Sequence, residues 1–314
     1  MLGKTAHGLY WLYRYLERAE NTARLIATGQ RIALTRSGSD STDEWRSVMQ
    51  TVGVLAGFRE HHDEITKDAA IDWMLRDPNN PSSVRAAIAT ARHNARLVRT
   101  AVTTEVWEAM NGCHMAVDKT LARKVNERDL PGVLGMIRQR TALVRGTTNG
   151  TMLRNDNYDF ARIGTFLERA DNTARILDMK YYVLLPSVMA VGSRLDNVQW
   201  ETILRSVSGL GGYRVAHGTD VRPLNIAHFL ILDGRMPRSL KFCASKLRDN
   251  LGYIAAGYDA DNPSLQMAEN LLAMFTHQDI EPVFEQGLHE YIQGVLLSLG
   301  QLGQQIEIDY RFYD

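Results

Sequence analysis

Hydrophobic residues between positions 9 and 35 recur every three or four residues. The series Leu12, Leu16, Ala19, Ala23 and Ile26 is the clearest example. Because an α-helix completes a turn every 3.6 residues, this spacing places one apolar stripe along the side of a long helix. Residues 156–184 carry a similar pattern. The sequence therefore predicts two equivalent central helices, near 8–35 and 156–184.

The rest of the chain also favours helices over strands, because few stretches alternate apolar and polar residues and only 8 of 314 residues are proline. Shorter helices are expected at 44–58, 65–76, 84–111, 117–125 and 130–145. Loops are expected at 37–43 and 77–83, with Ser82 or Ser83 as a helix cap. Residues 147–151, TTNGT, are expected to loosen the junction between the two halves. The pattern predicts an all-α fold of about ten to twelve helices.

A ten-residue segment occurs twice. LERAENTARL at 16–25 returns as LERADNTARI at 167–176, with eight of the ten positions identical. Trp45 and Trp200 correspond at a similar separation. A repeat at half the chain length indicates duplication. No linker rich in proline, glycine or serine divides the halves, so we predict a single domain over 1–314. It is expected to be a helical bundle with internal repeats of about 1–150 and 151–314 and a pseudo-two-fold axis.

The repeated segment places charges beside its apolar stripe. With Leu16 as the reference on a helical wheel, the stripe covers about −80° to +20°. Glu20, Arg24 and Glu17 follow at about 40°, 80° and 100° on one shoulder of the stripe. We call these three residues, together with the three at the same angles in the second copy, the charged arc. The second copy contributes Glu168, Asp171 and Arg175.

The charged arc has a structural and a functional interpretation. Glu20 and Arg24 are four residues apart, and exposed pairs at this spacing stabilise a helix by about 0.3–0.5 kcal/mol. If the two helices face each other, however, four carboxylates and two guanidinium groups converge with excess negative charge. Uncompensated carboxylates near a core are costly. They are therefore expected to hold a cation, a basic group of a ligand, or partner arginines.

Four further arginines bear on this site. Arg18 and Arg169 lie inside the repeated segment but point near 200° on the wheel, towards solvent or another element. Arg92 and Arg248 correspond between the halves inside otherwise apolar helices. They either bond to the acids of the arc or cap a neighbouring helix. The candidate binding residues are therefore Glu17, Glu20, Arg24, Glu168, Asp171, Arg175, Arg92 and Arg248.

Other chemical motifs are weak. Helical di-metal sites use Glu-x-x-His on two helices, whereas the spacing here gives Glu17-x-x-Glu20 without histidine, so neither a metal nor a cofactor is expected. Cys113 and His114 are neighbours in sequence and rarely meet as nucleophile and base. GLGGYR at 209–214 lacks a preceding strand and a Gly-Lys-Ser/Thr ending. We interpret it as small residues at a helix crossing or end, and no catalytic residue is assigned.

Composition excludes several partners. Lysine plus arginine and aspartate plus glutamate each number 36, so no overall field attracts nucleic acid or an anionic membrane. No stretch reaches roughly eighteen uncharged apolar residues, the length of a membrane span. The first twenty residues carry charges where a signal peptide is apolar. Two cysteines suit a reducing compartment. A cytoplasmic protein without nucleic-acid or membrane partners is expected.

Three segments carry a resemblance to a known family. LYWLYRYLERAENTARLI at 9–26, TTEVWEAMN at 103–111 and FARIGTFLERADNTARILDMKYY at 160–182 together resemble the alpha-E domain family over essentially the whole chain. One departure is Tyr13, which stands where the second copy has Gly164; its bulk would partly fill the space beside Glu17. The resemblance implies an all-helical bacterial protein encoded beside an ATP-grasp protein and often a transglutaminase-like cysteine peptidase. It assigns no catalytic residues.

These neighbours imply amide-bond chemistry on a peptide or peptide-like metabolite and leave three hypotheses. The first is a non-catalytic helical partner or substrate-holding module for an ATP-grasp amide ligase, with a peptide-like or amino-acid ligand. The second is an enzyme in which Glu17 or Glu168 is the general base and Arg24 or Arg175 binds a substrate carboxylate. The third is a scaffold in which the charged arc is only structural.

Overall fold

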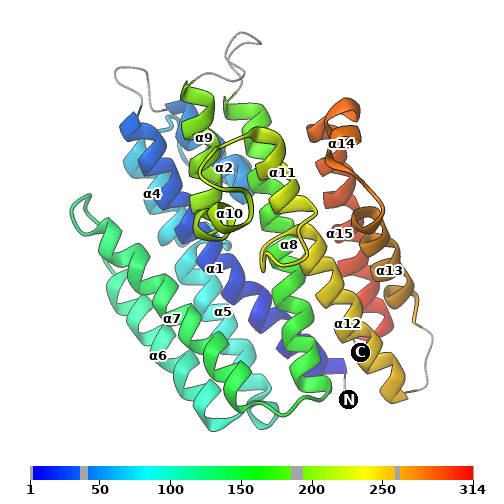
Figure 1. Cartoon of the computed structure of the whole chain (residues 1–314). Coiled ribbons are helices and arrows are strands. Elements are labelled where there is room, and N and C mark those ends of the chain that lie inside the picture. Colours follow the sequence, from blue (N-terminus) through cyan, green and yellow to red (C-terminus); the bar gives the residue numbers. More distant parts are fainter. Residues whose placement is uncertain (1–2, 36–41, 185–193, 259–261, 314) are drawn as a thin grey trace.

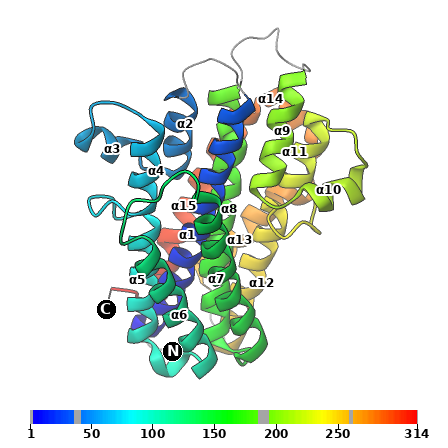
Figure 2. The ribbon, with the colours of Figure 1, turned by 90° about the vertical axis from the view of Figure 1, so that its left-hand side faces the viewer.

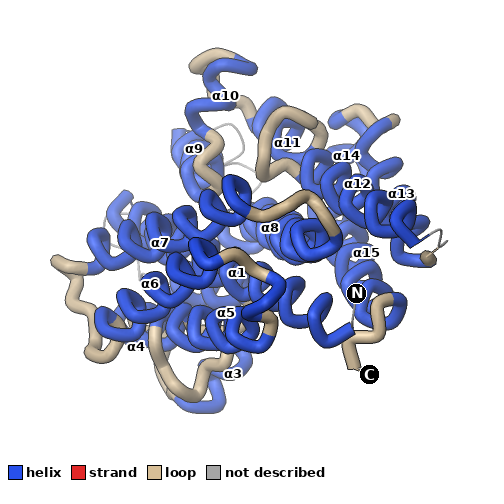
Figure 3. The backbone as a smooth tube through the Cα atoms, turned by 90° about the horizontal axis from the view of Figure 1, so that it is seen from below, coloured by secondary structure: helices blue, strands red, loops and turns tan. Residues whose placement is uncertain are grey.

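The computed structural model describes residues 3–35, 42–184, 194–258 and 262–313. These residues form fifteen α-helices and one short 3-10 helix, Arg99–Ala101, and contain no strand (Figures 1 and 3). The all-α prediction is confirmed. The first seven helices are α1 (Gly3–Thr35), α2 (Thr42–Val52), α3 (Leu55–His61), α4 (Lys67–Leu75), α5 (Val84–Leu97), α6 (Thr104–Thr120) and α7 (Leu130–Thr151). The other eight are α8 (Asp156–Leu184), α9 (Arg194–Ser206), α10 (Leu210–His217), α11 (Pro223–Ile231), α12 (Leu240–Tyr258), α13 (Pro263–Thr276), α14 (Ile280–Gln286) and α15 (Leu288–Asp309).

The helices are more numerous than the ten to twelve expected. Gly53, with a φ of 80°, divides the helix expected at 44–58 into α2 and α3. The helix expected at 117–125 is wrong, because α6 already includes 117–120 and ends there. Ser83 caps α5 as predicted, its hydroxyl accepting from the backbone N–H of Ala86. Most of the loop expected at 37–43 lies outside the described residues.

The expected loosening at 147–151 is also wrong, because these residues form the last turns of α7. The hydroxyl groups of Thr147 and Thr151 each donate to the carbonyl four residues earlier in the helix. Threonine can satisfy its hydroxyl in this way within a helix, so a run of threonines does not require a loop. After four further residues, 152–155, the chain enters α8.

Helices α1 and α8 lie side by side at the centre of the bundle, as Figures 2 and 3 show. They run in the same direction, because Tyr10 lies against Gly164 and Arg18 lies against Glu168 further along both helices. Helices α5 and α7 pack on α1, α12 and α15 pack on α8, and α2 packs against both central helices. The predicted long helices are therefore present, and both are central elements.

A close approach of backbones fixes this pair. A Cβ atom on Gly164 would stand 2.2 Å from the carbonyl oxygen of Tyr10, so only glycine fits at this crossing. Tyr13, which replaces glycine in the first copy, is buried and turns towards α7, where its hydroxyl bonds to that of Thr148. The two copies of the repeated segment therefore meet different neighbours at this position.

The predicted apolar stripe of α1 is confirmed. Leu12, Leu16, Ala19, Ala23 and Ile26 are all fully buried. None of the helices in the described ranges has the length and apolar character needed to cross a lipid bilayer. The stripe instead packs against other helices of the bundle, and this places the charged arc deep in the molecule.

Candidate functional site

Two buried glutamates each bind an arginine of the opposite central helix. Arg169 donates through Nε and Nη2 to the two carboxylate oxygens of Glu17, at 2.9 and 3.1 Å. Arg18 donates in the same two-pronged way to Glu168, at 2.6 and 3.0 Å. Such paired, charge-assisted hydrogen bonds are short and directional. The Glu-Arg dipeptide of each copy is therefore bound by the dipeptide of the other copy.

Two arginines from other elements join Glu17 and Glu20. Arg238, two residues before the start of α12, donates to Glu17 at 2.8 Å and to Glu20 at 3.0 Å. Arg145 of α7 forms ion pairs with both carboxylates. Arg24 completes the group by donating to Glu20 at 2.9 Å through Nε. Neither of the two buried acids lacks an arginine partner.

The second copy is held differently. Glu168 receives a second arginine, Arg14, whose Nε lies 2.9 Å from a carboxylate oxygen. Asp171 and Arg175 pair with each other at 2.7 Å, and their side chains are 24% and 39% exposed. The charged arc therefore consists of two buried clusters and one half-exposed pair, so the shielding of its acids is asymmetric.

The arginines keep the buried carboxylates ionised. Burial alone would raise the pKa of Glu17, but Arg169, Arg238 and Arg145 outweigh it and hold this pKa well below its usual value. Burial is likewise outweighed at Glu168, whose pKa is lowered by Arg18 and Arg14. At neutral pH these glutamates are therefore charged, paired and withdrawn from solvent.

The expected excess of negative charge is wrong. Five arginines outside the arc enter the clusters, so guanidinium groups outnumber the acids. Helix α1 is covered on several sides, and a side chain pointing away from its apolar stripe therefore meets α8 instead of water. The acids of the charged arc were expected to hold a cation, a basic group of a ligand or partner arginines, and the structure shows partner arginines. The five are Arg14, Arg18, Arg145, Arg169 and Arg238.

Arg92 and Arg248 lie away from the acids of the arc. Arg92 donates to the side chain of Asn111 on α6 at 3.0 Å. Arg248 pairs with its neighbour Asp249 at 3.1 Å. The predicted alternative in which Arg92 and Arg248 bond to the acids of the charged arc is therefore wrong. In the parts of the chain that are described, no three histidine, cysteine, aspartate or glutamate residues gather as a metal site would require.

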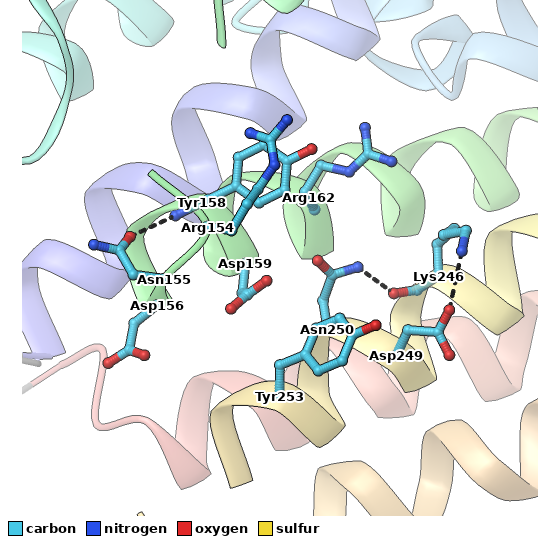
Figure 4. A pocket seen from close by; sticks show the side chains of 10 residues that line it. All are labelled: Arg154, Asn155, Asp156, Tyr158, Asp159, Arg162, Lys246, Asp249, Asn250 and Tyr253. Carbon is cyan, nitrogen blue, oxygen red and sulfur yellow. Dashed lines mark hydrogen bonds and ion pairs between the residues drawn. The ribbon is translucent and has the colours of Figure 1, made fainter. Parts of the chain in front are cut away.

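An open pocket lies between the start of α8 and the middle of α12 (Figure 4). Its volume is about 660 Å³, within the range of small-molecule sites. Asp159 and Asn250 point into it from the two helices, and their side chains are largely buried. Around them stand charged and aromatic side chains. These include Arg154, Asp156, Tyr158, Arg162, Lys246, Asp249 and Tyr253.

Asp159 is the unusual residue of this pocket. It is 7% exposed, and its carboxylate has no hydrogen bond or ion pair with any residue in the described ranges. Burial, and then the nearby Asp156, raise the pKa of Asp159 to about 6, against the opposing effect of Arg154 and Arg162. A carboxylate with an elevated pKa in a pocket marks a candidate site for a ligand.

Sequence reasoning missed part of the arginine clusters and did not bring the residues of this pocket together. Arg18 and Arg169 had a signal, since both lie within the repeated segment. Arg145 and Arg238 had none, because their neighbours in sequence say nothing about the helix they meet. The pocket joins residues about ninety positions apart that share no motif, so only packing brings them together.

The two cysteines are unsuited to nucleophilic chemistry. Cys113 and Cys243 are both buried as free thiols. Burial raises the pKa of each to about 12, although Arg140 and Arg169 act in the opposite direction. Since the thiolate is the reactive form, both groups are inert at neutral pH.

Three relatives of this chain are each described as an uncharacterized protein. An uncharacterized protein of Mycobacterium bovis and two of Mycobacterium tuberculosis strains are each 24% identical over 318 residues. The similarity covers 93% of this chain but 35% of each relative, so the chain spans about a third of the relatives' length. No solved structure matches the chain significantly.

A family profile described as "A predicted alpha-helical domain with a conserved ER motif" matches residues 1–310. ER stands for Glu-Arg, the dipeptide that each central helix contributes at Glu17-Arg18 and Glu168-Arg169. Their reciprocal ion pairs give such a motif a physical role, because each glutamate needs the arginine of the other copy. With the match over nearly its full length, the chain belongs to the Alpha-E family.

Proposed function

We propose that this chain is a non-catalytic, substrate-holding helical module. It acts with an ATP-grasp amide ligase, and with a transglutaminase-like peptidase, on a peptide or peptide-like metabolite. One observation carries the proposal: the open pocket between α8 and α12 presents a buried carboxylate without a protein partner, Asp159. The carboxylates of the arc, in contrast, are already bound by arginines.

The groups around the pocket suit an amino acid or the end of a peptide. Asp159 and the side-chain oxygen of Asn250 are acceptors for an ammonium group. Arg162 lies over the ring of Phe166, at 4.4 Å, and no carboxylate pairs with it among the described residues. Its guanidinium is suited to bind a ligand carboxylate. Amine and carboxylate are the two groups that an amide ligase joins.

The charged arc supports a holding role more than a catalytic one. Glu17 and Glu168 are 1% and 3% exposed, so neither can reach a substrate as a general base. Arg24 is already bonded to Glu20. The enzyme alternative is favoured by one observation, the pKa of about 6 at Asp159, which lies close to the range of a general base. In that alternative the base is Asp159.

The length of the mycobacterial relatives supports a module that works with other domains. They carry the matched region as about a third of a longer chain, so the region occurs next to further sequence. We place the pair of proteins in the cytoplasm, where ATP is available to a ligase. The partner and the location are both tested by co-purification of the tagged chain from its native host.

We further propose that the fold arose by duplication, with halves of about 1–150 and 151–314 related by a pseudo-two-fold axis. The repeated segment and the reciprocal Glu17–Arg169 and Glu168–Arg18 pairs support this. Superposition of α1 and its neighbours on α8 and its neighbours tests it. A rotation far from two-fold, or no common arrangement of the surrounding helices, would contradict the proposal.

Calorimetric titration tests the ligand. A free amino acid or dipeptide is expected to bind, whereas the same compound with an acetylated amine is expected to bind at least about tenfold more weakly, because it lacks the charge that Asp159 recognises. Asp159→Asn should reproduce this loss. Asp118→Asn, at a half-exposed ion pair on α6, is the matched control and should leave affinity unchanged.

Phosphate release separates the module from the enzyme. The isolated chain with ATP and candidate amino acids should release no phosphate, and its addition to the ATP-grasp partner should increase amide formation. Turnover by the isolated chain that disappears in Asp159→Asn would establish the enzyme alternative. Equal binding of free and acetylated ligands would remove the pocket from the proposal.

A further inference from the structure

A second pocket is lined by arginines. It lies between α1, α7 and the turn that joins α9 to α10, and its volume is about 220 Å³. The lining includes Arg24 and Arg31 of α1, Arg138 of α7 and Arg205 of α9. No carboxylate of the described residues lines it. It shares no residue with the pocket between α8 and α12.

Two of the four arginines are unpaired. Arg24 is bonded to Glu20, and Arg205 is bonded to Glu201 on its own helix. Within the described part of the chain, Arg31 and Arg138 form no ion pair. The one hydrogen bond of Arg138 there runs from Nε to the carbonyl of Leu134, at 3.3 Å. The terminal nitrogens of two guanidinium groups therefore remain available to a ligand.

Mutual repulsion leaves this group of cations ready for an anion. Burial lowers the pKa of Arg138, and the positive charges of Arg24 and Arg31 lower it further, against the attraction of Glu20. Arg138 is half-buried and Arg31 is exposed, and like charges held near a half-buried cation destabilise it. An anion bound between them would remove this repulsion.

The start of α10 faces the same pocket. Leu210 and Gly211 line it, and Gly209, the residue before the helix, provides no side-chain cap. The first backbone N–H of this end to bond within the helix is that of Tyr213, which donates to Gly209 at 2.8 Å. The N–H groups ahead of it have no carbonyl within the helix, and the helix dipole adds partial positive charge there.

Two details of the turn keep this end open. A Cβ atom on Gly211 would meet nothing within 4 Å, so the backbone borders free space. Ser208 has a φ of 54°, in the left-handed region that few residues other than glycine adopt, and its hydroxyl accepts from Arg24 at 2.5 Å. Strained backbone of this kind persists where surrounding contacts hold it, and it is common at ligand sites.

We propose that this pocket binds a phosphate group, either as free phosphate or as the monoester of a small molecule. Two unpaired guanidinium groups match the charge of a phosphate dianion, and the planar fork of arginine fits phosphate oxygens in pairs. The uncapped helix end supplies backbone donors, the usual anion site of helices. The volume equals roughly seven waters of about 30 Å³ each, enough for phosphate and a short attached group.

The inference goes beyond the proposed function and stands independently of it. GLGGYR at 209–214 was expected to serve only as small residues at a helix crossing or end. The structure places it at a helix start, as expected, and adds the surrounding arginines that sequence did not associate with it. This combination resembles a phosphate site in chemistry, without the strand and lysine of nucleotide-binding loops.

Titration calorimetry of the full chain tests the proposal, with inorganic phosphate and phosphoserine as the two probes and acetate as a weaker anion. Saturable phosphate binding is expected, at least about tenfold tighter than acetate. Arg31→Met and Arg138→Met should each weaken phosphate binding about tenfold or more. Arg140→Met, an exposed arginine two residues along α7, is the matched control and should change affinity less than about twofold.

Gly211→Asp gives a second, independent variant. Its carboxylate enters open space at a helix start, where an acid is tolerated, and should abolish phosphate binding while circular dichroism shows a folded chain. Asp159→Asn should bind phosphate normally, which separates this site from the pocket between α8 and α12. Tighter binding of phosphoserine would identify the monoester as the ligand, and binding of phosphate alone would identify the free ion. Equal affinity of the wild type, Arg138→Met and Gly211→Asp would overturn the proposal, as would equal affinity for acetate.

Discussion

Replacement of Glu17 by glutamine tests the physical basis of the central helix pair. Glutamine keeps the size of the side chain but removes its charge and turns one acceptor into a donor. Glu17 is 1% exposed and accepts from Arg169 at 2.9 Å and from Arg238 at 2.8 Å. The substitution therefore leaves these two guanidinium groups buried without their main partner.

The magnitude follows from charges and burial. Two unit charges about 4 Å apart attract by about 4 kcal/mol at an effective dielectric constant of about 20. Two such pairs are offset by a desolvation cost of several kcal/mol for each ion. We expect Glu17→Gln to lower the free energy of unfolding by about 3–5 kcal/mol. For a chain of 314 residues this corresponds to a fall in Tm of about 5–8 °C.

Urea unfolding at pH 7, followed by far-ultraviolet circular dichroism, measures this effect. Asp171→Asn is the matched control, because Asp171 pairs with Arg175 at a half-exposed position and should contribute less than about 1 kcal/mol. The double variant Glu17→Gln with Arg169→Gln should lose less free energy of unfolding than the sum of the losses in the two single variants, because either single change already breaks the ion pair. A loss in Glu17→Gln no larger than that of the control would refute the reasoning.

Three further predictions concern pH and packing. Arginines hold the folded pKa of Glu17 and Glu168 below the usual value of 4.5. The stability that these two glutamates confer is therefore present at neutral pH and is lost as the pH falls below about 4.5. Urea midpoints measured between pH 7 and pH 3 should show this loss, with a shallower fall in Glu168→Gln. The folded pKa of Asp159 is raised to about 6. The free energy of unfolding of Asp159→Asn should therefore equal that of the wild type near pH 4 and exceed it by roughly 1–2 kcal/mol above pH 6. Equal stability of the two proteins at pH 8 would contradict this. Gly164→Ala should lower the free energy of unfolding by about 1–3 kcal/mol or more, because the added methyl group clashes with α1. Gly146→Ala meets open space and should be neutral or stabilise the protein by up to about 1 kcal/mol. Thermal unfolding of the two variants distinguishes these outcomes.

The sequence by itself determined the all-α fold, the two long helices and the apolar stripe of α1. Each depends on the period of side chains along one helix, a local property that residues such as Leu12 and Leu16 display directly. The helix count depended on breaks, and these were less visible. Gly53 adopts a φ of 80°, but TTNGT continues α7 because its hydroxyl groups bond within the helix.

Only the tertiary structure decided what the charged arc does. The helical wheel gives the direction of a side chain from its own helix, and does not show which element lies there. Arg18 and Arg169 point away from the apolar stripe, yet they meet glutamates because α1 and α8 run parallel and in contact. Arg238 comes from a turn more than two hundred residues away from Glu17. The number of charged groups in the clusters, and hence the sign of their net charge, followed from these long-range contacts.

The two open pockets were likewise decided only by the tertiary structure. Asp159 and Asn250 face each other across α8 and α12, and Arg31, Arg138 and the start of α10 converge from three elements. No periodicity or motif links such residues, because their separation in space is set by how helices pack and not by the spacing within any one of them. Local pattern therefore specified which side chains are buried, and packing alone specified which partners they meet.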